Sequence, residues 1–301
     1  MPAHAMKRPR LRIALLLCLA VLPVACASTQ PPAPISPVTK TVTAWPSPSS
    51  SAVAPAVPRR GATTALAADF RRTAATIGMP VGVAIAPVGG NAVPALSLGD
   101  QTVRVAWSTI KVPLALAAER VNGPSAAETA AIVNSDNASA EQLWASLGTP
   151  TEAAAAVTAV LREGGDQQTV VPAQQLRAGF TIFGQTQWAL PDAATFTAHL
   201  PCLPGSAHVV QLMGQVAGNQ QWGVEVMRTP ASTAVKGGWG PGDSGGYLVR
   251  QIGLIRYRDG QSTAVTMSAF GGSMDGGIAA LNALARWLDR HIMRLPRGRC
   301  G

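Results

Sequence analysis

The spacing of apolar and polar positions predicts strands near both ends of the globular part of the chain. Apolar runs bounded by turn-forming residues are expected to form these strands: residues 81–87, 93–98, 222–227, 233–238, 247–257 and 262–269. The turn-prone segment 88–91 joins the first two. Strands are therefore expected on either side of a long central segment.

Helices are predicted before, between and after these strands. The first covers residues 63–77, and alanine-rich helical segments fill much of residues 106–163. The last covers residues 278–293, where Leu281 and Leu288 lie on one apolar face. The pattern predicts an α+β fold: an antiparallel sheet flanked by N- and C-terminal helices, with an inserted all-α lobe.

The N-terminal segment is typical of an exported, lipid-anchored protein. Residues 1–25 resemble a lipoprotein signal peptide, in which basic residues precede an apolar run too short to span a bilayer. Cys26 stands where a bacterial lipobox places the lipidated cysteine, and an ordinary leader cleaved nearby is the alternative. Residues 26–62, rich in Pro, Ser and Ala, are expected to form a disordered tether. We therefore expect a palmitate-bearing protein outside the cytoplasm, anchored to the bacterial cell membrane.

The basic net charge does not indicate a nucleic-acid partner. The chain carries 24 Lys and Arg against 15 Asp and Glu, a net charge of +9. Removal of the four basic leader residues leaves 20 against 15, or +5. Aromatic and basic residues are not interleaved as they are on nucleic-acid-binding surfaces. A mildly basic face suits an anionic membrane or wall polymer, and the pattern specifies no oligomeric state.

Cysteine and histidine positions favour a disulfide and no metal or cofactor. Outside the leader and the lipidation site, the cysteines are Cys202 and Cys300. Two cysteines in an exported domain are more often a disulfide than a catalytic pair. The histidines outside the leader, His199, His208 and His291, are scattered without metal-ligand spacing, so no metal site is predicted.

Two lysines of the globular part stand in short sequences whose side chains could take part in catalysis. Lys111 ends Ser108-Thr109-Ile110-Lys111 at the start of a predicted helix, and Lys236 opens Lys236-Gly237-Gly238 on a predicted strand. Residues three apart on a helix share a face, so the Lys111 amine can approach the Ser108 hydroxyl. An amine can lose its proton when it is desolvated, which arginine cannot do. Ser135-Asp136-Asn137 lies between the two sequences.

These three sequences resemble the S-x-x-K, S-D-N and K-T-G signatures of penicillin-recognising serine enzymes. Gly165-Asp166 with Thr169 resembles the G-D-x-x-T segment of class A β-lactamases, and Thr186 begins a segment similar to the helix that follows it. The resemblance covers about residues 63–295. It implies a β-lactamase-like domain at 63–301.

The same resemblance implies two lobes within that domain. An α/β lobe is expected from residues 63–103 and 216–301. A helical lobe is expected from residues 104–215.

The resemblance implies a catalytic role for four residues. Ser108 would be the nucleophile that accepts the acyl group, and Lys111 its base or proton relay. Ser135 would pass a proton to the leaving nitrogen, and Lys236 would attract the substrate carboxylate. The implied activity is serine acyl transfer of the β-lactamase or DD-peptidase kind, with a β-lactam or a peptidoglycan stem peptide as ligand.

Four further residues are implied to bind substrate. Asn137 would hold the acyl-amide carbonyl of the substrate. Gly237, Gly238 and Trp239, on the predicted strand, would line the substrate-binding site. The backbone amide of Trp239 would form an oxyanion hole with that of Ser108.

Departures from the family pattern predict little or no β-lactam hydrolysis. Gly237 replaces the threonine of K-T-G, and Trp239 is bulky where the family has a small residue. The position of the hydrolytic glutamate falls near Gln175, whose amide is no general base. Two hypotheses remain open: a slowly reacting acyl-enzyme, and a non-catalytic module that binds peptidoglycan or a protein partner.

Overall fold

The structure is a computed structural model that describes residues 60–89, 92–243 and 245–301, with side chains from Thr64 onward. Its α-helices are α1 (Arg60–Ile77), α2 (Lys111–Asn122), α3 (Ala126–Val133), α4 (Asn137–Ser146), α5 (Pro150–Glu163), α6 (Leu190–His199), α7 (Ala207–Met213) and α8 (Met274–Arg290). Its strands are β1 (Val81–Pro87), β2 (Leu96–Gly99), β3 (Arg104–Val105), β4 (Gln187–Trp188), β5 (Ser232–Pro241), β6 (Tyr247–Arg256) and β7 (Ser262–Gly271). Short 3-10 helices are η1 (Trp107–Ile110), η2 (Phe183–Gln185), η3 (Leu200–Cys202), η4 (Gly218–Gln220), η5 (Gly223–Val226) and η6 (Ile292–Arg294).

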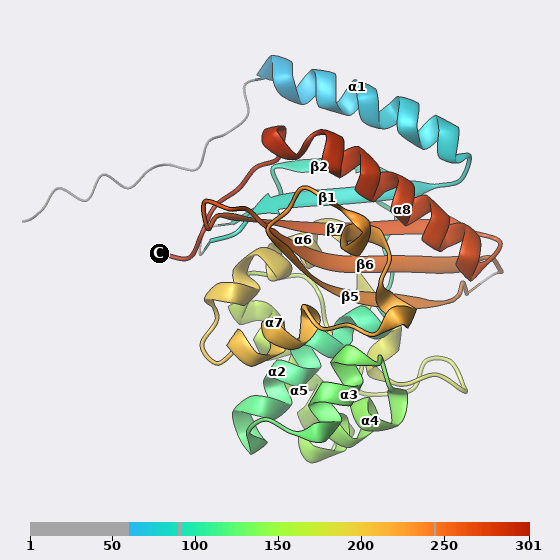
Figure 1. Cartoon of the computed structure of the whole chain (residues 1–301). Helices are drawn as coiled ribbons and strands as arrows, with labels where there is room; N and C mark the ends of the chain where they lie inside the picture. The colour runs from blue at the N-terminus through green and yellow to red at the C-terminus, as the bar shows by residue number, and fades with distance from the viewer. Residues whose placement is uncertain (1–59, 90–91, 244) are drawn as a thin grey trace, which may run out of the picture. The chain divides into compact units, whose positions relative to one another are not determined.

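Five strands form one antiparallel sheet in the order β2-β1-β7-β6-β5 (Figure 1). β3 pairs separately with β4. The β5–β6 ladder runs from Ser232 opposite Arg256 to Pro241 opposite Tyr247. This order places β5 at an edge of the sheet. Helices flank the sheet, so the predicted α+β fold is confirmed.

Helices α1 and α8 cover one face of the sheet (Figure 1). Val83 and Val265 of the sheet share an apolar core with Phe70 of α1 and Trp287 of α8. The two aromatic rings meet edge to face, with centroids 5.3 Å apart. The predicted terminal helices therefore close this face.

The other face of the sheet packs against α6 and the remaining helices. Side chains alternate along a strand, so Ala84 points away from the Val83 side and packs against Leu190 and Ala194 of α6. Ile252 of β6 joins the core that includes α2, α3 and α5. The sheet is thus buried on both faces, and α2, which follows the Ser108 turn, is held beneath it.

The segment 222–227 was expected to be a strand, and this expectation is wrong. It forms η5, whose first residue, Gly223, has φ of 64°. Its amides bond side chains in place of a ladder: Gly223 N–H donates to Asn282 Oδ1 at 2.7 Å, and Val224 N–H to Gln251 Oε1 at 2.8 Å. Side-chain acceptors therefore take the place of the backbone acceptors that a sixth strand of the sheet would have used.

Other element boundaries differ by a few residues from those expected. α1 begins at Arg60 and α8 at Met274, both earlier than the apolar pattern indicated. The second strand begins at Leu96, because Val93 is 66% exposed and contributes nothing to a buried face. Helix caps and exposed apolar residues shift such limits without changing the fold.

The predicted leader, the lipidation site Cys26 and the tether as far as Arg59 lie outside the described residues. Within residues 60–301, apart from the three not described, none of the helices combines the length and apolar character needed to cross a membrane.

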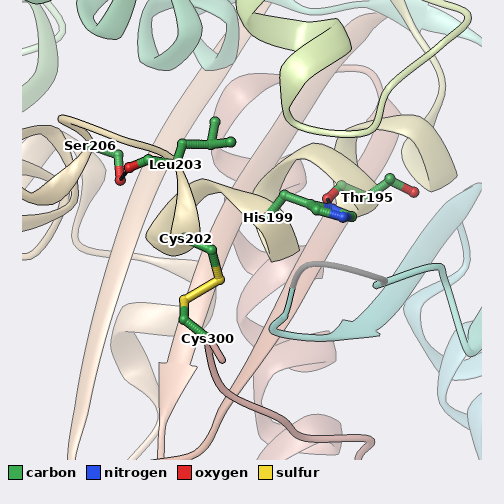
Figure 2. Close-up of a disulfide and its surroundings, with 6 residues drawn as sticks. All are labelled: Thr195, His199, Cys202, Leu203, Ser206 and Cys300. Carbon is green, nitrogen blue, oxygen red and sulfur yellow. Dashed lines mark hydrogen bonds between the residues drawn. A yellow bond between two sulfur atoms is a disulfide. The ribbon is translucent and has the colours of Figure 1, made fainter. Parts of the chain in front are cut away.

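The predicted disulfide between Cys202 and Cys300 is confirmed. It joins η3, after α6, to the C-terminal tail, with Cα atoms 5.3 Å apart (Figure 2). The tail is also held beside the start of β7, where Ser262 and Gly298 exchange two backbone hydrogen bonds of 2.7 and 3.0 Å. The bridge closes a loop of 98 residues that includes α7 and most of the sheet.

We expect the double variant Cys202→Ser/Cys300→Ser to lose about 4 to 5 kcal/mol of unfolding free energy, because a loop near 100 residues gains that much conformational entropy in the unfolded chain. Urea unfolding with and without reductant measures the loss. Reductant should destabilise the unmodified protein and leave the variant unchanged. Free thiols mapped to Cys202 and Cys300 in the denatured, unreduced protein would contradict the bridge.

Candidate active site

Ser108 lies in the 3-10 turn η1, between β3 and α2, and its side chain is partly exposed. The turn begins at Trp107, whose φ of 47° is unusual for a bulky residue. Space for the Trp107 ring exists because position 240 is glycine: a Cβ on Gly240 would come within 2.5 Å of that ring. The ring also meets Phe180 edge to face at 5.0 Å. Packing on both sides thus holds the turn that presents Ser108.

Gly238 of β5 lies directly against the backbone of this turn. A Cβ at Gly238 would stand 2.8 Å from the carbonyl oxygen of Ala106 and 3.0 Å from the amides of Ser108 and Thr109. The approach is backbone to backbone, so no flexible side chain can move aside. Gly238 therefore allows the sheet edge to reach η1, and it brings the next residue, Trp239, beside Ser108.

Ser135 lies in the turn between α3 and α4, with φ of 58°. The Asp136 N–H donates to the last turn of α3, and the Asp136 carboxylate caps α4 by accepting from the Ser139 N–H at 2.6 Å. Lys236 Nζ donates to Ser135 Oγ at 2.8 Å, and Lys111 Nζ donates to the Ser135 carbonyl at 2.6 Å. Both predicted lysines therefore meet at Ser135.

Lys111 is almost fully buried at the start of α2. Its amine donates to the carbonyls of Ser135 and Asp136, at 2.6 and 3.1 Å, and to Asn137 Oδ1 at 2.8 Å. None of these acceptors is Ser108. Desolvation lowers the pKa of Lys111 to about 8, although the charges of Asp136 and Glu141 oppose the shift. Three acceptors suit the ammonium form, and a pKa near 8 brings the neutral amine within reach at mildly alkaline pH.

Lys236 is fully buried on β5. Besides Ser135 Oγ, it donates to Gln220 Oε1 at 2.5 Å and to the Gly237 carbonyl at 3.0 Å. Burial lowers the pKa of Lys236 well below its usual value, and the charge of Lys111 lowers it further. Lys236 therefore lies behind Ser135 and contacts the cleft through the Ser135 hydroxyl.

Gln220 is a site residue that the sequence did not reveal, because an isolated glutamine between apolar segments belongs to no motif. It is fully buried, and its amide nitrogen donates to the carbonyls of Ile132 and Val133 at 2.9 Å each. Its oxygen accepts from Lys236 and from the Gly237 N–H at 3.0 Å. Gln220 thus links the end of α3, just before Ser135, to β5.

The glycine in place of the K-T-G threonine is explained by Trp222. A Cβ at Gly237 would stand 2.6 and 2.9 Å from two atoms of the Trp222 ring. That ring is buried, donates through Nε1 to the Asn219 carbonyl at 2.9 Å, and meets Trp239 edge to face at 6.3 Å. The ring occupies the space that a threonine side chain would need. The position of Trp222 therefore explains why residue 237 has no hydroxyl.

A cleft of about 280 Å³ opens at Ser108. Its walls are mainly aromatic or small, and the lining residues are Trp107, Ser108, Ser135, Asn137, Gly179, Phe180, Thr181, Phe183, Gly184, Trp239, Gly240, Pro241 and Tyr247. The structure thus brings four predicted residues to one cavity: Ser108, Ser135, Asn137 and Trp239. The other four, Lys111, Lys236, Gly237 and Gly238, are buried behind it.

The loop 164–186 supplies the wall that the sequence did not predict. Asp166 anchors its start by accepting from Trp188 Nε1 at 2.9 Å. Buried Gln185 donates to the carbonyls of Phe180 and Thr181 at 3.2 and 3.1 Å. These contacts hold Phe180 at the cleft.

Arg177 ties the same loop to the end of β5. Its guanidinium donates to the Pro241 carbonyl at 3.2 Å and to Asp243 at 2.8 Å, and it lies 4.6 Å from the Phe180 ring centroid. The Ser108 cleft therefore has a loop fastened to the sheet edge on one side.

Gln175, expected near the position of the hydrolytic glutamate, does not line the cleft. It is exposed, and its amide nitrogen donates to the Phe180 carbonyl at 2.9 Å. Among the described residues that line the cleft there is no aspartate or glutamate. The cavity therefore offers no carboxylate to activate a water.

The fold that carries this site is that of the class A β-lactamases. A β-lactamase from Xanthomonas campestris pv. campestris matches with 18% identity and a TM-score of 0.59, over 77% of this chain and 98% of that one. PenP from Rhodopseudomonas palustris, described as a class A β-lactamase, matches with 19% identity and 0.57, over 77% and 100%. An ancestral Gram-negative class A β-lactamase matches with 19% and 0.54, over 75% and 99%. No protein-family model and no curated protein matches the sequence.

We expect Gly237→Thr to lower the unfolding free energy by about 1–3 kcal/mol, because the new side chain overlaps the Trp222 ring. Combining it with Trp222→Leu should cost less than the two single changes added together, by roughly 0.5–3 kcal/mol. Urea unfolding of the four proteins measures this coupling.

Gly272→Thr is the matched control, since Gly272 is exposed and has open space around it. Its effect should stay within about 0.5 kcal/mol. Strictly additive losses at positions 237 and 222 would show that the two sites do not share this space.

Proposed function

We propose that this protein is a cell-envelope lipoprotein whose domain forms an acyl-enzyme slowly at Ser108, with β-lactams or D-alanyl peptides, and hydrolyses it little or not at all. One observation carries the proposal: Ser108 and Ser135 open onto a single cleft, two buried lysines bond to Ser135, and no carboxylate lines the cavity.

Acylation requires a base for the Ser108 hydroxyl. In the proposed step the Ser108 oxygen forms a bond to the substrate carbonyl carbon, and its proton passes to the neutral amine of Lys111. The Ser108 and Trp239 amides would stabilise the oxyanion, supported by the close approach of Gly238 to η1. The existing hydrogen bonds of Lys111 must rearrange, because its amine bonds residues 135–137 in the resting structure. This rearrangement favours slow acylation.

The leaving nitrogen then needs a proton as its bond to the carbonyl carbon breaks. Ser135 would donate it, since its hydroxyl lies in the cleft and accepts a hydrogen bond from Lys236. Lys236 can replace that proton on Ser135, and its own lowered pKa eases the transfer. Asn137 would hold the acyl-amide carbonyl at the cleft wall.

Release of the acyl group is the step that this site supports least. An acyl-enzyme that keeps the opened ring in the cleft needs a base to activate a water. Gln175 is turned toward Phe180, and the described lining residues include no carboxylate. We therefore propose that the acyl-enzyme accumulates and is not turned over.

The alternative is a non-catalytic module that binds peptidoglycan or a protein partner. Trp222 fills the space of the K-T-G threonine, and Lys236 already has three hydrogen-bond acceptors. Both features weaken recognition of a substrate carboxylate. The sequence resemblance to the alanine-rich lipoprotein LppW supports the envelope location under either hypothesis, with Cys26 as the lipid anchor.

Intact-mass analysis after exposure to several β-lactams tests the proposed function. We expect a mass increase equal to one β-lactam, mapped to Ser108, and no increase in Ser108→Ala. Ser97→Ala, at an exposed serine of β2, is the control and should react like the unmodified protein.

Chromogenic substrate should be hydrolysed negligibly by the same sample. Rapid turnover lost in Ser108→Ala would contradict the proposed failure of deacylation. Absence of any adduct would favour the binding module.

The rate of adduct formation should rise with pH, because only neutral Lys111 can accept the Ser108 proton. Below its pKa of about 8 the neutral fraction grows about tenfold for each pH unit, and above it the rate should level off. The midpoint belongs to the coupled lysine pair. Intact-mass measurement of the adduct in samples quenched at successive times, at several pH values, checks this profile. A flat profile, or an undiminished rate in Lys111→Arg, would exclude Lys111 as the base.

A further inference from the structure

Three potential metal ligands from three helices meet outside the Ser108 cleft. Glu119 of α2 and Glu128 of α3 each approach His208 of α7: the distances from His208 Nδ1 to their Oε2 atoms are 3.6 and 3.4 Å. The side chain of Glu128 is 1% exposed and that of Glu119 is 13% exposed. No described Arg or Lys pairs with either carboxylate. One buried and one partly buried acid therefore face one imidazole without a fixed positive charge.

Each of these three residues keeps one buried polar atom without a hydrogen bond. Within the described part of the chain, Glu119 Oε2, Glu128 Oε1 and His208 Nδ1 are all buried and have no hydrogen-bond partner. The capping box of α3 uses Glu128 Oε2, which accepts from the Ser125 N–H at 3.4 Å and is also the oxygen that lies 3.4 Å from His208 Nδ1. Buried acceptors without partners are unfavourable. Helix capping thus leaves the second oxygen of Glu128, the buried Oε1, without a partner.

The separations fit a shared cation better than direct hydrogen bonds. Tetrahedral Zn²⁺ with bonds of about 2.0–2.1 Å places neighbouring ligand atoms about 3.3–3.4 Å apart. The two measured separations, 3.4 and 3.6 Å, are close to that edge length. One ligand atom from each of the three residues lies within 4.8 Å of the others, so small side-chain movements complete the site.

We propose that Glu119, Glu128 and His208 form a Zn²⁺ site with a fourth position left for water. An imidazole among the ligands favours zinc over magnesium or calcium, which prefer oxygen ligands alone. Two carboxylates balance the charge of the ion.

The site would act as a brace behind the Ser108 cleft. Glu119 follows Lys111 on α2 by about 12 Å along the axis, at 1.5 Å per residue. Glu128 lies on α3, which ends just before the turn that holds Ser135. The ion would therefore join α2 and α3 to α7 without lining the cleft. Sequence spacing gave no sign of it, because the three ligands come from separate helices.

A shared proton is the rival explanation for the two facing acids. Burial raises the pKa of Glu128 to about 8, and the neighbouring Glu119 carboxyl adds to the shift. A proton held between the carboxyls would then serve in place of a metal. The rival predicts no specific zinc affinity, so metal binding distinguishes the two.

The test uses the untagged full-length protein, stripped with EDTA and dialysed, then titrated with Zn²⁺, Co²⁺ or Mg²⁺. We expect one Zn²⁺ per chain at this site by elemental analysis, a rise in the unfolding temperature, and the visible spectrum of tetrahedral Co²⁺. Mg²⁺ should do none of this. Glu128→Gln and His208→Gln should each weaken zinc binding by more than the roughly 10- to 100-fold that outer-shell changes produce.

His291→Asn is the matched control, since this histidine bonds Asp69 on the other side of the sheet and should leave zinc binding unchanged. His208 is partly exposed, so His208→Gln is expected to fold even if the buried Glu128→Gln does not. Circular dichroism checks both. Zinc binding that survives both substitutions, or no stoichiometric binding by the folded unmodified protein, would overturn the proposal.

Discussion

The close approach of Gly238 to the turn η1 is the constraint on which the rest of this site depends. The edge strand β5 and the Ser108 turn lie far apart in the sequence, yet their backbones are in contact. Any side chain at Gly238 would push them apart. The contact sets Trp239 beside Ser108, and the neighbouring Gly240 leaves room for the Trp107 ring. One short glycine-containing stretch thus determines the shape of the cleft.

Two buried amines supply the electrostatic character of the site. Lys111 and Lys236 both bond Ser135, and desolvation lowers the pKa of each. Their hydrogen bonds hold three segments together: the start of α2, the turn after α3, and β5, the last of these with help from Gln220. The same network that poises the protons also fixes the resting geometry, in which Lys111 bonds residues 135–137. Lys111 would have to leave these hydrogen bonds before its amine could reach the Ser108 hydroxyl.

The walls of the cleft are built from features that depart from the β-lactamase pattern. Trp222 fills the space beside Gly237, and the loop 164–186 places Phe180 at the cavity and is tied to β5 through Arg177. Gln175, which belongs to this loop, donates to the Phe180 carbonyl. The cavity is consequently aromatic and lacks a carboxylate among its described lining residues, which suits retention of a bound group better than its hydrolysis.

The sequence by itself determined the α+β class, the main strands and the motif residues, because apolar periodicity and short motifs are local properties. It also indicated the disulfide, because two cysteines remain outside the leader and the lipidation site. Only the tertiary structure decided that Gln220 connects Lys236 to α3, that Trp222 excludes a threonine at Gly237, and that 222–227 forms η5. Each depends on contacts between segments far apart in the chain. The same reason hid the Glu119, Glu128 and His208 cluster: helix packing, not spacing along the chain, brings these side chains together.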